Sequence, residues 1–216
     1  SQSKEAGFVS VILLLSAELF VQKSIEIRPD VPQVFFGLIS VYCLIRFLLN
    51  QDNRCLLYSG LAAAISFLFL QKTIFLLLAY GLIGAYGLIK RELSIRATCY
   101  FAGGFLLPLL LYGTYLLMSG SWHDYFLTNW QLNWRNLGST GITAEPLRPM
   151  IDSLIPNFSL CLVAVASIFY CFIKKGTSKG IRIVVIVALA QLGSLALFAT
   201  IFKHYYLFPF TLFAIP

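Results

Sequence analysis

Long apolar segments alternate with short polar turns along the whole chain. About 18 or more apolar residues are needed to cross roughly 30 Å of hydrocarbon, and lipid cannot hydrogen-bond to the backbone, so each such segment is expected to be a helix. The fold class predicted is an all-α, polytopic transmembrane helix bundle. The pattern indicates about seven full spans and the start of an eighth, truncated one, at residues 6–21, 31–49, 55–70, 74–89, 97–118, 151–173, 183–202 and from 205 onward.

Composition agrees with a membrane protein and changes the picture in two further respects. Apolar residues make up 59% of the 216 residues and charged residues only 12%, whereas soluble domains are about a quarter charged. The net charge of +7 does not indicate nucleic-acid binding, because the charges lie in short loops. Five cysteines are scattered through apolar segments without a Cys-x-x-Cys pair, so we read them as buried hydrophobes and expect neither a disulfide nor a metal site.

The distribution of Lys and Arg predicts the orientation of the spans, because cytoplasmic loops are enriched in these residues. One side of the predicted topology collects Lys4, Arg46, Arg54, Lys90, Arg91, Arg96, Lys174, Lys175, Lys179 and Arg182. The other side collects Lys23, Arg28, Lys72, Arg135, Arg148 and Lys203. The first, more basic side is predicted to be cytoplasmic, which places the unusual polar segments of the chain together on the outer face.

The segment Glu26-Ile-Arg-Pro-Asp30 has three charges between two apolar spans, where charge is costly and usually functional. Pro29 disfavours helix at Arg28, so the Asp30 side chain could cap the next helix. The functional alternative makes Asp30 a proton acceptor, or a hydroxyl-binding group, at an outer cavity. Arg28 would then contact phosphate, and Glu26 would border the pocket.

Two further polar segments lie on the same predicted face. Lys72 either extends to the headgroups or is the counter-charge of a lipid phosphate. Near the end of the chain a cation, a titratable ring and two phenols enter the membrane together: Lys203, His204, Tyr205 and Tyr206. These four are candidate residues for binding a phosphate or another part of a substrate, although a lone histidine is more often structural.

The long outer loop, residues 119–150, contains all three tryptophans. The segment Trp122–Trp134 could be a short amphipathic helix in the membrane interface, where indole rings are favoured. The alternative is that Trp130, Trp134 and Arg135 form the rim of a sugar or polyprenyl pocket.

Glycines recur within two of the predicted spans. Gly81, Gly84 and Gly87 stand three residues apart in one span, and Gly103-Gly104 lies in the next. Such residues permit close contact between membrane helices. A specific packing seam and ordinary membrane-helix glycines remain equal alternatives for both groups.

Three motifs resemble the integral-membrane glycosyltransferases of the GT-C type, and most closely the family of protein O-mannosyltransferases and lipid A aminoarabinose transferases (glycosyltransferase family 39-like). Arg28-Pro29-Asp30 followed by Phe35-Phe36 is similar to the "R-P-D … F-F" opening of a span in that family. The stretch from Gly60 to Thr73 is similar to "G-L-x-x-G-L-A-F-L-T-K", with Gln71 in place of the Thr and Ala64 in place of a Gly. Residues 203–210 are similar to "K-x-x-Y-Y-x-x-P".

The resemblance implies transfer of a sugar from a polyprenyl-phosphate-linked donor to a lipid, glycan or protein acceptor at the outer leaflet, without a cofactor. It aligns Asp30 with the second acidic position of the family, and Lys72 and residues 203–206 with positions near the donor phosphate. The main catalytic acid of the family lies in an earlier outer loop. We therefore expect residues 1–216 to be one transmembrane domain of a longer protein, inactive as this fragment, with its N-terminal and C-terminal parts missing.

The resemblance also implies a location, and other protein classes remain open. We expect a bacterial inner membrane, with the site facing outside. A transporter or lipid flippase would also concentrate polar residues at an outward-facing cavity, but it more often shows inverted repeats. A structural membrane subunit is a third alternative.

Overall fold

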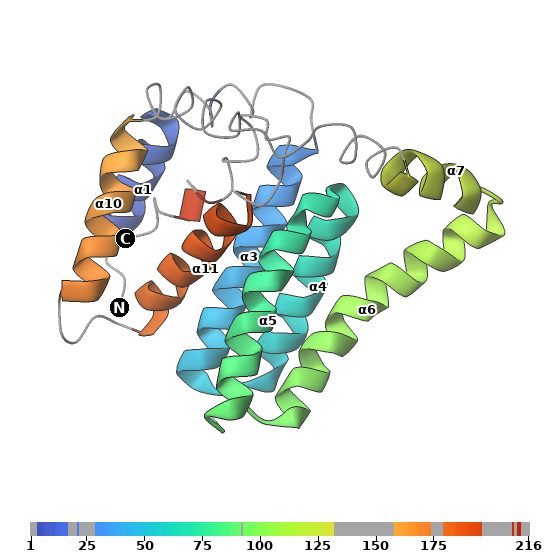
Figure 1. Ribbon diagram of the computed structural model, residues 1–216, viewed down its shortest axis with the longest axis horizontal. Coiled ribbons are helices and arrows are strands. Elements are labelled where there is room, and N and C mark those ends of the chain that lie inside the picture. Colours follow the sequence, from blue (N-terminus) through green and yellow to red (C-terminus); the bar gives the residue numbers. More distant parts are fainter. Residues whose placement is uncertain are drawn as a thin grey trace.

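Three adjacent antiparallel helices form the centre of the molecule: α3 (Asp30–Asn50), α4 (Asn53–Phe69) and α5 (Ile74–Ile89). The computed structural model describes residues 4–16, 21, 29–91, 93–131, 158–173, 179–195, 209, 211 and 212, and every regular element in these residues is helical. The next helix, α6 (Ile95–Met118), packs on α4 at one end and diverges from the bundle toward its other end (Figure 1). It leads into α7 (Trp122–Phe126) and the π-helical turn η2 (Leu127–Gln131).

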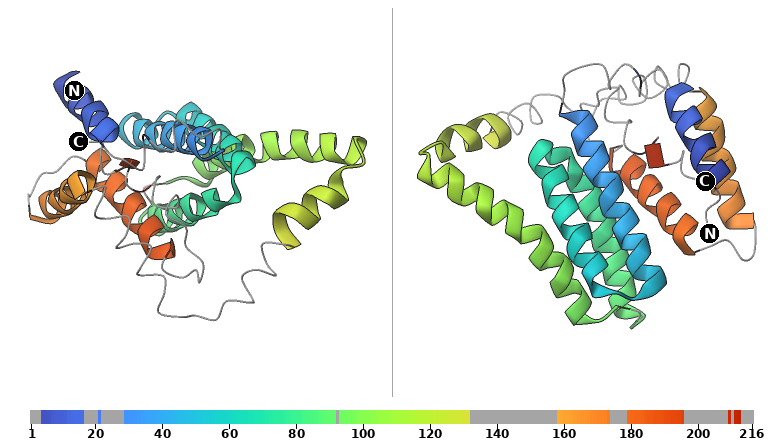
Figure 2. Two further views of the ribbon diagram at one scale, coloured as in Figure 1. Left: turned by 90° about the horizontal axis from the view of Figure 1, so that it is seen from above. Right: turned by 180° about the vertical axis from the view of Figure 1, so that it is seen from behind.

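Three more helices lie on the other side of the bundle. Helix α11 (Lys179–Leu195) packs against α5 and α3. Beyond it, α10 (Phe158–Ile173) contacts both α11 and α1 (Lys4–Ser16). The three views agree that α6 and the α1–α10 pair lie at opposite ends of the molecule (Figures 1 and 2).

Short turns with local hydrogen bonds reverse the chain between the central helices. Gln51 ends α3 in the left-handed conformation, with φ 57°. The side chain of Asp52 then accepts a hydrogen bond from the backbone N–H of Arg54 at 3.0 Å, which caps the start of α4. Ser94 caps α6 in the same way through the N–H of Ala97. The connections are therefore too short for anything but antiparallel neighbours.

Each of the seven predicted full spans overlaps a helix of the described part of the chain, and the predicted range 74–89 coincides with α5. Among the described residues, three segments are long and apolar enough to cross a membrane: Asp30–Asn50, Gln71–Ile89 and Ile95–Met118. Helix α4 and residues Gly180–Gly193 of α11 are apolar but shorter. The protein is an all-α membrane helix bundle, whereas the number of spans stays a prediction. The eighth predicted span and residues 151–157 lie almost entirely outside the described residues.

The core lies between α3, α4, α5 and α11, where Val41, Phe47, Leu76 and Val187 are almost fully buried. A polar trio also lies in this core. Ser40 Oγ donates to the Ser59 carbonyl at 2.8 Å, and Ser59 Oγ donates to the Ser40 carbonyl at 2.9 Å. Since each hydroxyl has one proton, Tyr80 must be the donor in its 2.9 Å hydrogen bond to Ser40 Oγ. The trio joins α3, α4 and α5 without leaving these hydroxyls unsatisfied.

The glycines divide into two kinds. Gly60 and Gly104 mark the crossing of α4 and α6: a Cβ at Gly60 would lie 2.8 Å from Phe105 N, and one at Gly104 would lie 3.2 Å from Leu61 N. Here the packing-seam interpretation is correct for Gly104. By contrast, Gly81 and Gly84 have no neighbour within 4 Å of such a Cβ, and both line an apolar cavity of about 520 Å³ between α3, α4, α5 and α6.

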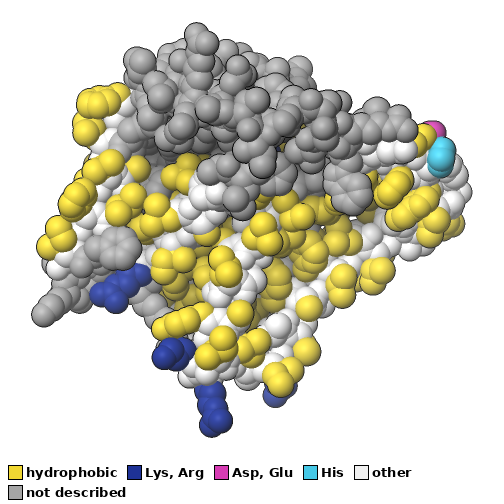
Figure 3. Space-filling model, in the orientation of Figure 1, with side chains coloured by type: hydrophobic (Ala, Val, Ile, Leu, Met, Phe, Trp, Pro, Cys, Tyr) yellow, Lys and Arg dark blue, Asp and Glu magenta, His cyan; other side chains and the backbone are white. Residues whose placement is uncertain are grey.

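Within the described residues, exposed basic side chains gather at one edge of the bundle. Apolar side chains cover the helix surfaces, and Lys and Arg side chains lie at the lower edge in the view of Figure 3. Exposed basic residues at the turns of this end include Arg46, Arg54, Lys90, Arg91 and Arg96. We call these five residues the basic edge. It lies at the end of the bundle opposite to the start of α3.

Candidate active site

The candidate site begins at the first residue of α3. Pro29 precedes the helix with φ −70° and has no side-chain cap, and its carbonyl accepts the first helical hydrogen bond from Gln33 N at 3.1 Å. Asp30 is therefore inside the helix, and its carboxylate does not act as the N-cap that was one of the sequence interpretations. The N-terminal turn still favours its negative charge, since the helix dipole is positive there.

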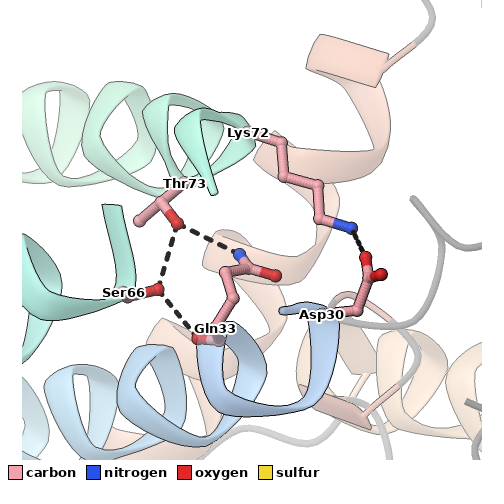
Figure 4. Close-up of polar contacts among 5 residues, drawn as sticks. All are labelled: Asp30, Gln33, Ser66, Lys72 and Thr73. Atoms are coloured by element: carbon pink, nitrogen blue, oxygen red, sulfur yellow. Dashed lines mark hydrogen bonds and ion pairs between the residues drawn. The ribbon is translucent and has the colours of Figure 1, made fainter. Parts of the chain in front are cut away.

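Lys72 reaches this carboxylate because the chain reverses tightly between α4 and α5. Leu70 is extended, with φ −151° and ψ 128°, and the 3₁₀ turn η1 (Gln71–Thr73) follows directly before α5. This reversal brings Lys72 to the start of α3, where its Nζ forms an ion pair with Asp30 Oδ1 (Figure 4). Two residues 42 positions apart, both predicted from the sequence to be site residues, thus lie in direct contact.

The ion pair is largely withdrawn from solvent. The Lys72 side chain is 12% exposed and that of Asp30 is 5% exposed, so Lys72 does not extend freely to the headgroups. Burying charges costs several kcal/mol per ion, and a buried pair is for this reason weak evidence for stability. A buried carboxylate and ammonium in contact at one end of a membrane bundle are instead typical of a functional site.

Three polar side chains form a hydrogen-bond network beside the ion pair. Gln33 Nε2 donates to Thr73 Oγ1 at 3.1 Å, and the hydroxyls of Ser66 and Thr73 share a hydrogen bond of 3.0 Å. Ser66 Oγ donates to the backbone carbonyl of Gln33 at 2.8 Å. All three residues are at most 2% exposed. They come from α3, α4 and η1, so this network fixes the same three elements that carry Asp30 and Lys72 (Figure 4).

The outer loop meets the bundle at the same end. Trp130 packs on Phe67 of α4, with the ring centroids 6.3 Å apart, and the preceding Asn129 accepts a hydrogen bond from Gln71 Nε2 at 3.0 Å. Trp130 is thus held near η1, as a residue at the rim of the site would be. Of the predicted amphipathic helix, Trp122–Phe126 is α-helical and Leu127–Gln131 is π-helical, while its last residues lie outside the described part of the chain.

The remaining predicted site residues lie outside the described residues, and their positions stay predictions. They are Glu26, Arg28, Trp134, Arg135, Lys203, His204, Tyr205 and Tyr206. In the part of the chain that is described, no three His, Cys, Asp or Glu side chains come together as a metal site would require.

Sequence reasoning did not single out Gln33, Ser66 or Thr73 as site residues. One signal was present: Gln33 follows Asp30 by three residues, which places both on one face of a helix. The partnership of Ser66 with Gln33 had no such signal, because it depends on how α3 and α4 are rotated against each other.

Comparison with known proteins identifies the family. A family model described as dolichyl-phosphate-mannose-protein mannosyltransferase matches residues 1–117, which is more than half of the chain. No curated protein and no solved structure matches. The matched region contains the ion pair and the polar network around it. The chain therefore belongs to the dolichyl-phosphate-mannose-protein mannosyltransferase family, and it is a membrane glycosyltransferase of the GT-C kind.

Proposed function

We propose that this protein transfers a sugar from a polyprenyl-phosphate-linked donor to an acceptor at the outer leaflet, and that the Asp30–Lys72 pair is part of its active site. The observation that carries the proposal is the burial of this ion pair at the end of the bundle opposite to the basic edge. Because Lys and Arg are enriched on the cytoplasmic side, the pair is assigned to the outer face. The family membership supports glycosyl transfer over the transporter and structural-subunit alternatives.

Lys72 is proposed to bind the phosphate of the donor. During transfer the bond between the anomeric carbon and the phosphate oxygen breaks, and the polyprenyl phosphate leaves with the electron pair. An ammonium already fixed in a site sheltered from water stabilises this developing charge more strongly than it would in bulk water. Since phosphate would compete with Asp30 for the ammonium, donor binding would also free the carboxylate.

Asp30 is proposed to act on the acceptor. A carboxylate beside the reacting centre accepts the proton of the acceptor hydroxyl while the hydroxyl oxygen forms its bond to the anomeric carbon. Alternatively, Asp30 serves only to hold Lys72 in place. In that case loss of the carboxylate disturbs donor binding and leaves the use of the acceptor unchanged.

The test is a transfer assay on the intact protein in membranes, with labelled dolichyl-phosphate mannose as the first donor and a polyprenyl-phosphate-linked aminoarabinose as the second. Asp30→Asn and Lys72→Ala are each expected to lower transfer by at least about a hundredfold, within the range for loss of one acid–base or charge-stabilising group. Exposed residues provide matched controls: Asp124→Asn at the same end of the bundle and Lys90→Ala at the basic edge.

Each outcome either supports or contradicts the proposal, once size-exclusion chromatography has verified that the variants are folded. Loss of transfer in both site variants, with both controls active, supports the proposal. Full activity in Asp30→Asn and Lys72→Ala makes the ion pair structural. If the wild-type protein transfers sugar from neither donor, the donor class is wrong.

A further inference from the structure

The side-chain amide of Gln33 has its direction fixed by a chain of hydrogen bonds. Ser66 Oγ donates its single proton to the backbone carbonyl of Gln33, 2.8 Å away, because a carbonyl only accepts. In the 3.0 Å hydrogen bond between Ser66 and Thr73, Thr73 must therefore be the donor. Its proton is then used, and Thr73 Oγ1 accepts at 3.1 Å from the NH₂ group of Gln33. The reverse orientation of the amide would leave two acceptors facing each other.

The consequence is that Gln33 Oε1 must face away from Thr73. Figure 4 shows this oxygen on the side of the amide that faces the Asp30–Lys72 ion pair. Gln33 is 2% exposed, and Oε1 has no hydrogen-bond partner among the residues that the structure describes. Most buried polar atoms in proteins do have a partner, so an acceptor held in this direction requires an explanation.

We propose that Gln33 is a carbohydrate-binding residue of this site, whose Oε1 accepts a hydrogen bond from a sugar hydroxyl when substrate occupies the Asp30–Lys72 end. This inference rests on the proposed function and assigns a ligand group to a residue that takes no part in the chemistry described above. Thr73 and Ser66 are positioning residues, which act through the orientation of the amide. Because Oε1 is buried, a sugar hydroxyl reaches it only when neighbouring side chains move aside.

The chemistry of the ligand separates the roles of the two neighbouring groups. A phosphate of the donor offers only acceptor oxygens, so it binds Lys72 and gains nothing from Oε1. A sugar hydroxyl offers a proton and satisfies Oε1. The hydroxyl belongs either to the transferred sugar or to a carbohydrate acceptor, and kinetics distinguish these two sources.

The experiment compares Gln33→Met with the wild-type protein in the same membrane transfer assay. Methionine keeps the length of the side chain and removes the acceptor. We expect the KM for one substrate to rise roughly ten- to hundredfold, the range for a lost hydrogen bond that leaves a buried group unpaired. A higher KM for the donor places the hydroxyl on the transferred sugar. A higher KM for the acceptor places the hydroxyl on the carbohydrate acceptor.

Monodeoxy analogues of the mannosyl donor give a second readout. If the hydroxyl belongs to the transferred sugar, the KM of the wild-type protein for one analogue should be raised by the same factor as Gln33→Met raises the KM for the normal donor. With that analogue, Gln33→Met should raise the KM no further. Thr73→Ser keeps the hydroxyl that orients the amide and should retain the wild-type KM. Thr73→Val removes it and should raise the same KM as Gln33→Met does.

Ser40→Ala is the matched control, because it removes a buried hydrogen bond ten residues further along α3 than Asp30, about 15 Å along the helix axis. It should lower stability and leave both KM values unchanged. Equal KM values in Gln33→Met and the wild-type protein, in a preparation in which Asp30→Asn abolishes transfer, would overturn the inference while the proposed function stands. Absence of transfer from both donors by the wild-type protein would overturn both.

Discussion

The crossing of α4 and α6 allows a sharp test of the packing, because adjacent glycines on α6 have opposite environments. A Cβ on Gly104 would overlap the carbonyl oxygen of Leu57 and lie 3.1 Å from its carbonyl carbon and 3.2 Å from Leu61 N. A Cβ on Gly103 would meet nothing within 4 Å. Gly103→Ala and Gly104→Ala therefore make the same chemical change at adjacent positions of α6. Only Gly104→Ala brings the added methyl group against the backbone of α4.

The magnitude follows from the type of atom that is in the way. Carbon atoms pack best at about 3.5–4.0 Å, and the obstructing atoms belong to the backbone of α4, so the helices must separate by up to about 1 Å. Overpacking of this kind costs about 1–3 kcal/mol. Replacing Gly by Ala in an open helical position is favourable by about 0.5–1 kcal/mol. This gain is common to both variants, so they should differ by the overpacking cost, roughly 1–3 kcal/mol in free energy of unfolding.

Thermal unfolding of the purified protein in detergent measures this difference. For a chain of this size about 1 kcal/mol corresponds to 2–4 °C in Tm, so Gly104→Ala should unfold at least about 2 °C below Gly103→Ala. Gly103→Ala should match or exceed the wild-type Tm. Equal Tm values for the two variants would refute the close crossing of α4 and α6.

Three further predictions concern the ion pair, the polar trio and the orientation. The double variant Asp30→Asn/Lys72→Met should unfold at a higher temperature than Asp30→Asn alone, because the single change leaves the buried charge of Lys72 unpaired, at a cost of about 3–5 kcal/mol. The double variant should nevertheless remain inactive. If the double variant unfolds below the single one, the pair is not coupled. Ser40→Ala should lower the free energy of unfolding by about 1–3 kcal/mol, since Tyr80 loses its buried acceptor; denaturant titration measures this, and no change would exclude the trio as a stabilising contact. In intact cells an impermeant maleimide should label Ser121→Cys and spare Arg91→Cys, since the basic edge is assigned to the cytoplasm; the reverse pattern would invert the orientation.

Several features of the fold could be predicted from the sequence because they depend on local properties. The alternation of apolar runs and polar turns located the central helices to within a few residues, and the turn at Asn50–Arg54 is as tight as predicted. A membrane helix satisfies its own backbone, so its existence needs no information about neighbours. The sorting of basic residues to one edge follows from the same alternation, since each turn must lie on the side opposite to the one before.

The pairing of side chains could not be predicted in the same way. Two interpretations of Asp30 and two of Lys72 were equally consistent with the sequence, and only the reversal through η1 brings the two side chains into contact. The glycine pattern had the same ambiguity. The regularly spaced Gly81 and Gly84 border a cavity, while Gly104 forms the helix contact.

The sequence by itself thus determined that the chain is a bundle of membrane helices, where the turns of its central part lie, and which residues carry unusual charge. The tertiary structure decided that Asp30 meets Lys72, and that Ser66 and Thr73 turn the oxygen of Gln33 toward the same end. The physical reason is that hydropathy is a property of each segment alone. A contact between helices depends on their rotation and crossing, and these are set by the packing of all neighbours together.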